Sequence, residues 1–503
     1  MMILKKFPDK AKFMELCRTC NVVPVCRTIL ADTKTPVSIL EKFYRRNDPI
    51  FLLESVEGGE RWARYSFLGV SAQAHIQVFN DHIEITTQGE KKILAHHNDP
   101  LTVLQSITEP YHPCEINGLP RFWCGLTGYI TYEMVSFFEN IPVFLPKDKP
   151  YAHFIIPDEM IIFDNIKQNM TLVRICYLNG QSDSDQTYET ACKDLDRLMA
   201  EIDENLPGKK TRRSSSARPE RLQAETEPEV YKKGVETIKN HIVEGDIIQA
   251  VYSQTFSCRA PQDPVMLYRA QRYINPSPYM FFMNFKEITI AGSSPETMVR
   301  LENNKATLRP IAGTRKRGKS EQEDRILADE LLNDEKERAE HLMLVDLGRN
   351  DLGRVAEIGS VQVTDMMFVE RYSHVMHLVS NITCDMNPGL SAWDLLKATF
   401  PAGTLSGAPK IRAMEIISEL EKEPRGIYGG AAGYISFSGN MDLAITIRTA
   451  SIESGRIKVQ AGAGIVADSD PEKELMECMN KAKSVETALQ LAMTSENGGD
   501  ACS

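Results

Sequence analysis

The strongest constraint on the fold lies near the end of the chain, where residues 430–464 read GAAGYISFSGNMDLAITIRTASIESGRIKVQAGAG. Apolar and polar side chains alternate through this segment, and two-residue breaks at Gly439-Asn440 and Ser454-Gly455 divide it into three stretches. Alternation with a period of two is typical of half-buried strands, and two-residue connections favour hairpins. The segment therefore predicts three consecutive antiparallel strands.

Similar patterns predict the remaining elements. Alternating stretches at 75–87 and 159–178 indicate two hairpins in the first half of the chain, and residues 246–256 alternate like a strand. Helical spacing of apolar residues predicts helices at 231–242, 322–347 and 471–492. Sheets with separate helices, and no internal repeat, indicate an α+β fold.

The chain of 503 residues is longer than one ordinary core requires, and a polar segment divides it. Residues 207–228 mix proline, serine and charge with almost no apolar side chain, which is typical of a linker. We therefore predict a sheet-rich N-terminal lobe over 1–206, a second domain over 229–495 and a short tail over 496–503.

The acidic balance excludes several classes of partner. A net charge of -11 and a pI near 5.6 give no basic field for nucleic acid or an anionic membrane. The sequence shows neither a secretion signal nor a membrane span, so we expect a cytoplasmic protein. Its eleven cysteines are scattered, and Cys17 and Cys20 lack the second pair that a zinc site needs, so we expect reduced thiols.

Carboxylates on two predicted helices are candidate metal ligands. Glu340 lies on one helix, while Glu477 and Lys481 lie four residues apart on another. Mg²⁺ accepts one or two protein carboxylates and completes its shell with water and substrate oxygens. Exposed helical salt bridges are the alternative, which the pattern alone favours. The sequence shows no serine-hydrolase elbow, P-loop or dinucleotide fingerprint, so a Mg²⁺-dependent enzyme for a small acidic substrate is the better hypothesis.

Three other features allow two interpretations each. Arg448 lies in an alternating stretch. Its guanidinium group could bind a carboxylate through two hydrogen bonds, or it could belong to a solvated face of the strand. The triplet 462–464 could bring backbone N–H groups close to an anion, or form a simple tight turn. His374 and His377 could be ordinary core or edge residues, or one could carry a proton.

Several motifs together resemble the chorismate-utilising enzymes, and among them most closely the large subunits of anthranilate synthases. The motifs, in chain order over about 230–490, are PIAGTRKRG, EHLMLVDLGRNDLGRV, ERYSHVMHLVS, TFPAGTLSGAPKIRAMEII, IYGGAAGYISF and VQAGAGIVADSDPEKE. The stretches LLES (52–55), GERWARYSFLG and PYMFF extend the similarity to the N-terminal half. The resemblance implies an α+β fold in which two antiparallel sheets pack together with helices outside.

The resemblance also implies roles for individual residues. Glu340 and Glu477 match Mg²⁺ ligands, and Glu296 matches the acid that helps the C4 hydroxyl of chorismate to leave. His377, Thr404 and Gln249 match positions beside the reacting ring. The positions that match substrate contacts are Gly313, Thr314, Tyr428, Arg448, Gly462, Ala463, Gly464 and Lys481.

Two missing lysines indicate the nucleophile. Aminodeoxychorismate synthases carry a lysine nucleophile where Ala312 stands, and water-using isochorismate and salicylate synthases carry a lysine base at the position of Gln249. Ammonia needs neither device, so the sequence indicates ammonia addition at C2, loss of the C4 hydroxyl and pyruvate elimination to give anthranilate. An aminodeoxychorismate or isochorismate synthase is the runner-up, and a non-catalytic amino-acid sensor is the alternative from another class. The basic residues Lys316 and Arg317 could steer the acidic substrate, although a solvated turn is favoured.

By the same resemblance the chain has a partner and an inhibitor. No G-x-C-x-G motif surrounds any cysteine, so we expect ammonia to come from a separate glutamine amidotransferase subunit within a hetero-oligomer. Ser55 with Pro278, Tyr279 and Met280 matches the family's regulatory tryptophan pocket, drawn from both sides of the linker. The resemblance therefore predicts the first committed step of tryptophan biosynthesis, with feedback inhibition by tryptophan.

Overall fold

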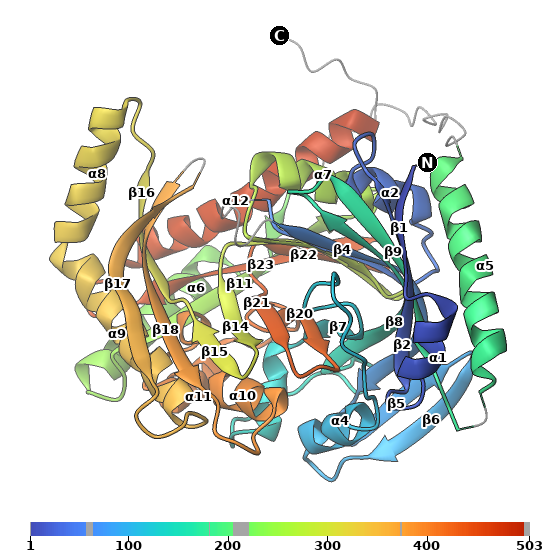
Figure 1. Ribbon diagram of the computed structural model, residues 1–503. Helices are drawn as coiled ribbons and strands as arrows, with labels where there is room; N and C mark the ends of the chain where they lie inside the picture. Colours follow the sequence, from blue (N-terminus) through green and yellow to red (C-terminus); the bar gives the residue numbers. More distant parts are fainter. Residues whose placement is uncertain (1, 57–63, 181, 205–220, 373–374, 497–503) are drawn as a thin grey trace.

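The computed structural model describes residues 2–56, 64–180, 182–204, 221–372 and 375–496 (Figure 1). Strands and helices are both abundant, and all pairings between the strands are antiparallel, so the fold is α+β. Hydrogen bonds connect 23 strands into one continuous network, so the expected arrangement of two separate packed sheets is not confirmed.

The strands are β1 (Ile3–Phe7), β2 (Val22–Leu30), β3 (Ile50–Glu54), β4 (Tyr65–Val78), β5 (His82–Thr87), β6 (Glu90–Ala95), β7 (Gly125–Ile130), β8 (Ala152–Asp164), β9 (Asn169–Tyr177), β10 (Gln223–Ala224), β11 (Gln249–Arg259), β12 (Tyr279–Asn284), β13 (Ile288–Ser294), β14 (Thr297–Glu302), β15 (Lys305–Leu308), β16 (Ile311–Lys316), β17 (Gln362–Arg371), β18 (Val375–Asp385), β19 (Gly407–Ala408), β20 (Ala431–Ser436), β21 (Met441–Ile445), β22 (Thr449–Glu453) and β23 (Arg456–Ile465).

The helices are α1 (Lys10–Leu16), α2 (Pro36–Phe43), α4 (Pro100–Thr108), α5 (Ser184–Asp203), α6 (Pro228–Val243), α7 (Pro264–Ile274), α8 (Glu321–Asn333), α9 (Glu335–Gly353), α10 (Ala392–Thr399), α11 (Lys410–Leu420) and α12 (Pro471–Glu496), with short 3-10 turns η1 (Tyr132–Phe137) and η2 (Gly403–Leu405). Among the described residues, no helix is both long and apolar enough to cross a lipid bilayer.

Strands from the two halves of the chain pair directly. β3 lies beside β12, and β7 lies beside β20, so one sheet continues across the predicted linker. The largest apolar cluster likewise combines Phe51 and Phe67 with Phe281 and Phe282. Residues 207–220 of the predicted linker and 497–503 of the predicted tail lie outside the described residues, but β10 near the end of the predicted linker pairs with β11.

The predicted hairpins are confirmed, with one correction. β4 pairs with β5, β8 with β9, β20 with β21, and β22 with β23. The middle strand of the segment 430–464 is not continuous, because the chain breaks between β21 and β22 at 446–448. Arg448 has a φ of 49°, in the left-handed region that side chains rarely adopt, so the alternating pattern conceals a corner.

The single long helix predicted over 322–347 is also wrong. Asp334 ends α8 and begins α9, and its side chain accepts hydrogen bonds from the N–H groups of Lys336 and Glu337. Apolar periodicity continues across this break, because both helices pack near strands β16 and β18. An aspartate that caps a helix N-terminus was the local signal for the break.

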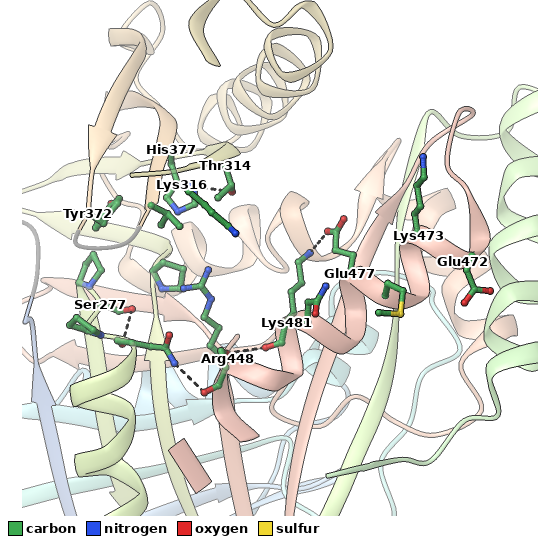
Figure 2. Close-up of a pocket in the computed structure, with 18 residues that line it drawn as sticks. Ser277, Thr314, Lys316, Tyr372, His377, Arg448, Glu472, Lys473, Glu477 and Lys481 are labelled. Carbon is green, nitrogen blue, oxygen red and sulfur yellow. Dashed lines mark hydrogen bonds and ion pairs between the residues drawn. The ribbon is translucent and has the colours of Figure 1, made fainter. Parts of the chain in front are cut away.

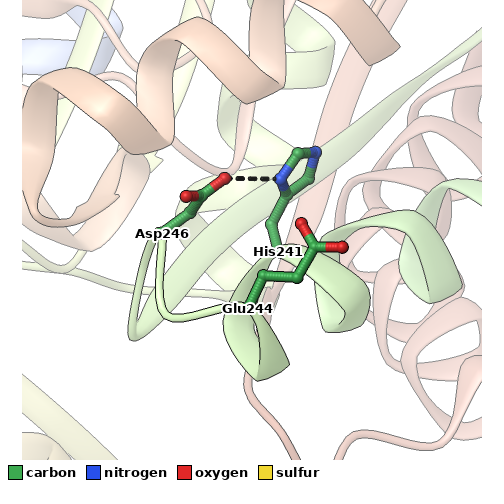
Figure 3. A group of neighbouring side chains, drawn as sticks. All are labelled: His241, Glu244 and Asp246. Atoms are coloured by element: carbon green, nitrogen blue, oxygen red, sulfur yellow. Dashed lines mark hydrogen bonds and ion pairs between the residues drawn. The ribbon is translucent and has the colours of Figure 1, made fainter.

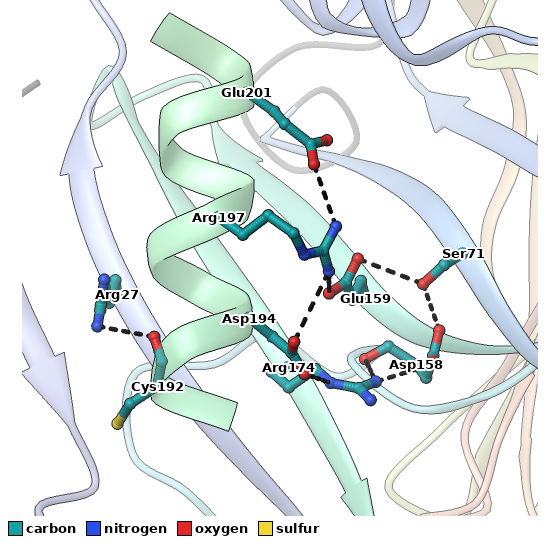
Figure 4. Close-up of polar contacts among 9 residues, drawn as sticks. All are labelled: Arg27, Ser71, Asp158, Glu159, Arg174, Cys192, Asp194, Arg197 and Glu201. Atoms are coloured by element: carbon teal, nitrogen blue, oxygen red, sulfur yellow. Dashed lines mark hydrogen bonds and ion pairs between the residues drawn. The ribbon is translucent and has the colours of Figure 1, made fainter. Parts of the chain in front are cut away.

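Helix α5 is attached to the N-terminal strands by charged contacts (Figure 4). Arg174 on β9 bonds Asp194 on the helix at 2.9 Å, and Arg197 on the helix pairs with the buried Glu159 on β8. The apolar side of α5 completes the contact with Leu195, Leu198 and Ile202, all buried. No disulfide joins the ten cysteines in the described part of the chain.

Candidate active site

One cavity of about 650 Å³ collects most of the predicted site residues from strands and helices far apart in the sequence. It lies between β11, β16, β23 and the helices α9 and α12. We call it the substrate cavity. The predicted residues that line it are Gln249, Glu296, Gly313, Thr314, Glu340, Thr404, Tyr428, Arg448, Gly462, Gly464, Glu477 and Lys481.

Two predicted residues lie elsewhere. Ala463 is fully buried in an apolar cluster on the other face of β23, so only its neighbours Gly462 and Gly464 reach the cavity. His377 lines an adjoining cavity of about 790 Å³, which we call the outer cavity (Figure 2). Thr314, Arg448, Glu477 and Lys481 line both cavities, so the two spaces form one continuous site.

Four carboxylates from α9 and α12 line the substrate cavity, where the sequence predicted two. Glu337 and Glu340 come from α9, and Glu474 and Glu477 come from α12. The sequence pattern that could have indicated all four is a Glu-x-x-Glu spacing, which occurs on both helices and places each pair on one helix face. Glu337 and Glu474 were not predicted, because the motif resemblance indicated one metal ligand on each helix.

Carboxylate oxygens suit a hard divalent cation, but among the described residues no three of these four carboxylates bring their ligand atoms within 4.8 Å of one another. Loss of hydration, and then repulsion from Glu337 and Glu477, raises the pKa of Glu340. A cation held between the two helices would remove this repulsion, and oxygen ligands are those that Mg²⁺ prefers. Glu477 also pairs with Lys481 at 2.8 Å and is about half exposed, so the salt bridge that the pattern favoured exists beside the predicted ligand role.

Glu296 is the most strongly perturbed acid in the substrate cavity. It lies between β13 and β14, with 8% of its surface exposed. Burial raises its pKa to about 7, although Thr404, Arg448 and Lys481 stabilise the charged form. A carboxyl group with this pKa holds a proton near neutral pH and can give it to a leaving group.

His377 is held as a neutral imidazole. Loss of hydration lowers its pKa, and its Nδ1 lies 2.9 Å from the carbonyl oxygen of Gly313. Because a carbonyl oxygen only accepts hydrogen bonds, Nδ1 carries the proton and Nε2 keeps a lone pair. His377 is therefore set up to accept a proton. Its predicted alternative, His374, lies outside the described residues.

The cationic and glycine positions can hold an anionic substrate. The left-handed corner directs the Arg448 side chain into the site, where it lines both cavities. Lys481 Nζ donates to the Gly462 carbonyl at 2.9 Å, so the last helix is fastened to β23. A side chain on Gly464 would lie 2.5 Å from Gln249 Nε2, so this glycine permits a close approach within a strand. The tight turn considered for 462–464 is therefore wrong.

Lys316 and Arg317 are exposed, as the solvated alternative requires, although Lys316 belongs to β16 and Arg317 is ion-paired. Arg315 pairs with Asp334 and Glu337, and Arg317 bonds Asp324 at 2.8 Å. Only Lys316 of this run lines the outer cavity. The run mainly attaches β16 to the acidic starts of α8 and α9, so it contributes little charge for steering.

A third cavity of about 1260 Å³ lies where the two halves of the chain meet, and we call it the junction groove. Ser55, Pro278, Tyr279 and Met280 line it, so the structure brings together the four residues predicted for the regulatory pocket. Glu54, on the same strand end, is held by Tyr268 at 2.6 Å and Arg272 at 2.8 Å.

A compact group outside these cavities consists of His241, Glu244 and Asp246, at the end of α6 (Figure 3). Asp246 already bonds His241 at 2.9 Å and Arg412 at 3.2 Å. The Arg412 guanidinium supplies the positive charge that a cation would bring, so this group is explained by ion pairing.

Comparisons with known proteins identify relatives that cover nearly the whole chain. The family model described as chorismate binding enzyme matches residues 49–487. Anthranilate synthase component 1 of Aquifex aeolicus is 44% identical over 494 residues, covering 96% of this chain and 97% of the relative. The corresponding protein of Pseudomonas putida is 44% identical over 492 residues, covering 96% and 99%.

Solved structures show the same fold. Anthranilate synthase component I of Streptococcus pneumoniae superposes with a TM-score of 0.74 at 36% identity, covering 91% of this chain and 99% of that chain. The menaquinone-specific isochorismate synthase of Escherichia coli, at 20% identity and a TM-score of 0.67, covers 95% of this chain and 99% of its own and shares the fold alone. The chain therefore belongs to the chorismate-binding enzymes and, within that family, to the anthranilate synthase component 1 proteins.

Proposed function

We propose that this chain converts chorismate and ammonia to anthranilate, pyruvate and water, as the large subunit of an anthranilate synthase. The observation that carries the proposal is a single cavity with an acid whose pKa is raised to about 7, two carboxylate pairs and three cationic side chains, into which Gln249 rather than a lysine projects. Glutamine cannot deprotonate water, whereas ammonia is itself a nucleophile.

Substrate binding follows from the charges of the cavity. Chorismate carries two carboxylates, and Arg448 with the N–H groups near Gly462 and Gly464 can hold one of them. Glu340 and Glu477 would hold Mg²⁺, with Glu337 and Glu474 beside them. Bound there, Mg²⁺ supplies positive charge and open coordination positions for an anionic oxygen. Holding both ends of the substrate fixes the ring relative to Glu296.

The chain's own groups then move the protons. Ammonia adds at C2 while the C4–O bond breaks, and Glu296 donates its proton so that the C4 hydroxyl leaves as water. Removal of the C2 proton then expels the enolpyruvyl group as pyruvate and makes the ring aromatic. Nε2 of His377 is the base that this geometry offers for that second proton.

A partner subunit completes the proposed enzyme. We infer that a glutamine amidotransferase supplies ammonia in a cytoplasmic hetero-oligomer, since no cysteine of this sequence stands in a G-x-C-x-G motif. The purified chain should form anthranilate from chorismate and ammonium salts, but not from glutamine. Mass analysis of the product tests this directly, because aminodeoxychorismate or isochorismate would show a different reaction. Glutamine turnover by the chain alone would contradict the two-subunit proposal.

We also propose that the junction groove binds tryptophan as a feedback inhibitor. The groove combines the end of β3 with the start of β12, so a ligand there contacts both halves of the chain. The Tyr279 hydroxyl lies 3.0 Å from Thr297 Oγ1, and Thr297 follows Glu296. A ligand that favours another arrangement of Tyr279 would therefore disturb the acid and weaken chorismate binding reciprocally.

A further inference from the structure

A row of polar side chains runs along one face of β16, β17 and β18. His377 on β18 lies opposite Glu370 on β17 and opposite Thr314 on β16. Directly opposite residues in antiparallel strands project to the same face. Glu370 lines the junction groove, whereas His377 and Thr314 line the outer cavity. The row therefore connects the two spaces.

The Glu370 carboxylate is held from two sides. Arg309 Nη2 donates to Glu370 Oε2 at 2.9 Å, and the Tyr372 hydroxyl donates to the same oxygen at 2.9 Å. Arg309 Nε also donates to Asn381 Oδ1 at 2.9 Å. The side chains of Arg309 and Glu370 are 9% and 23% exposed, so water competes weakly for these charge-assisted bonds. This arrangement fixes the Tyr372 ring through its hydroxyl.

The Tyr372 ring in turn contacts the imidazole of His377. The ring centroids are 5.7 Å apart with an interplanar angle of 63°, an edge-to-face contact. Figure 2 shows both side chains at the outer cavity. The imidazole is thus held by the Gly313 carbonyl at Nδ1 and by the Tyr372 ring. Tyr372 cannot itself abstract the proton, because its hydroxyl is already donated to Glu370.

We propose that Glu370 is a positioning residue for His377 and acts through Tyr372. The carboxylate orients the tyrosine, the tyrosine ring limits rotation of the imidazole, and the imidazole keeps Nε2 directed toward the ring carbon that loses its proton. The proposal rests on the catalytic part of the proposed function. It differs from a purely structural role, in which the same contacts would only hold strands β17 and β18 together.

Two substitutions separate these roles. Tyr372→Phe keeps the ring and removes the donor, while Glu370→Gln keeps the shape and removes the charge. Both should lower kcat about tenfold and leave KM for chorismate within about twofold, because a misplaced base slows the reaction without removing a substrate contact. Tyr177→Phe is the matched control, since its hydroxyl donates to the Pro157 carbonyl at 2.7 Å in the N-terminal strands. The control should keep the parental kcat.

A spectroscopic measurement makes the test independent of turnover. In protein labelled with ¹⁵N-histidine, the His377→Asn variant identifies the His377 ring resonances. These should move in Tyr372→Phe and Glu370→Gln and stay in place in Tyr177→Phe. The proposal would be overturned if Tyr372→Phe and Glu370→Gln left both the His377 resonances and kcat unchanged. It would also be overturned if kcat fell equally in these two variants and in the Tyr177→Phe control. The His377 resonances could move in the two variants while the parent protein fails to convert chorismate with ammonium. That result would support the positioning role and overturn the proposed reaction.

Discussion

The substrate cavity and the junction groove are both lined by charged residues, but they differ in whether these charges are paired with opposite charges. In the groove the charges meet partners: Arg121 bonds Asp442 at 2.9 Å, and Arg300 bonds Glu302 at 2.8 Å. In the substrate cavity burial raises the pKa values of Glu296 and Glu340, and at Glu340 repulsion from neighbouring carboxylates raises it further. A site for chemistry needs groups moved from their ordinary protonation, whereas a site that only binds can balance its own charges.

The two sites also differ in which parts of the chain build them. All lining residues of the substrate cavity fall between Gln249 and Lys481. The groove combines segments of the second half with first-half residues, namely Leu53, Glu54, Ser55, Arg64, Tyr65, Phe67, Pro120, Arg121 and Ile166. A ligand in the groove can therefore bias how the halves meet, while the catalytic groups stay on one half.

The largest expected effect is at the two proposed metal ligands, Glu340 and Glu477. Glu340→Gln or Glu477→Gln removes a charged metal ligand and should lower activity by roughly a hundredfold or more. Steady-state assays with Mg²⁺ titration measure this loss. Glu335→Gln, at an exposed position on α9, is the control and should keep parental activity. Full activity of both variants in a chelator would show that the cavity does not work through a metal.

The second-largest expected effect is the dependence of the reaction rate on pH through the protonation of Glu296. Its pKa is raised to about 7, so the proton-donating form is present below that pH and is lost as the pH rises through it. The rate per free ammonia should therefore fall about tenfold for each pH unit above 7. Rates at several ammonium concentrations, corrected to free ammonia, give the profile. In Glu296→Gln the slope should disappear along with most of the activity; a slope that persists there must come from another group.

The smallest expected effect on turnover is in the junction groove. Ser55→Phe fills part of the groove and should raise the inhibitory tryptophan concentration at least about tenfold, while uninhibited turnover stays within a few-fold of the parent. Anthranilate fluorescence during a tryptophan titration measures both quantities. Ser106→Phe at an exposed position on α4 is the control. A parent enzyme that tryptophan does not inhibit, or an unchanged curve in Ser55→Phe, would remove the regulatory role and leave catalysis intact.

Much of the candidate site was predictable because its chemistry lies in short motifs. Glu296, Glu340, Glu477 and Lys481 were expected from motif resemblance, and all four reach one cavity. Glu370 was not predicted, because its importance comes from Arg309, 61 positions away in the sequence, and from Tyr372 beside His377. Nothing in the local pattern distinguishes such a glutamate from an exposed one on an edge strand.

By itself the sequence determined the hairpins, the α+β class and the candidates for the reactive groups, since alternation, turns and motifs act over a few residues. Only the tertiary structure decided the corner at Arg448, the break at Asp334, the continuous sheet across the two halves and the partners of each charge. Burial and pairing are set by residues far apart in the chain. They determine whether a carboxylate is a salt bridge, an acid or a metal ligand.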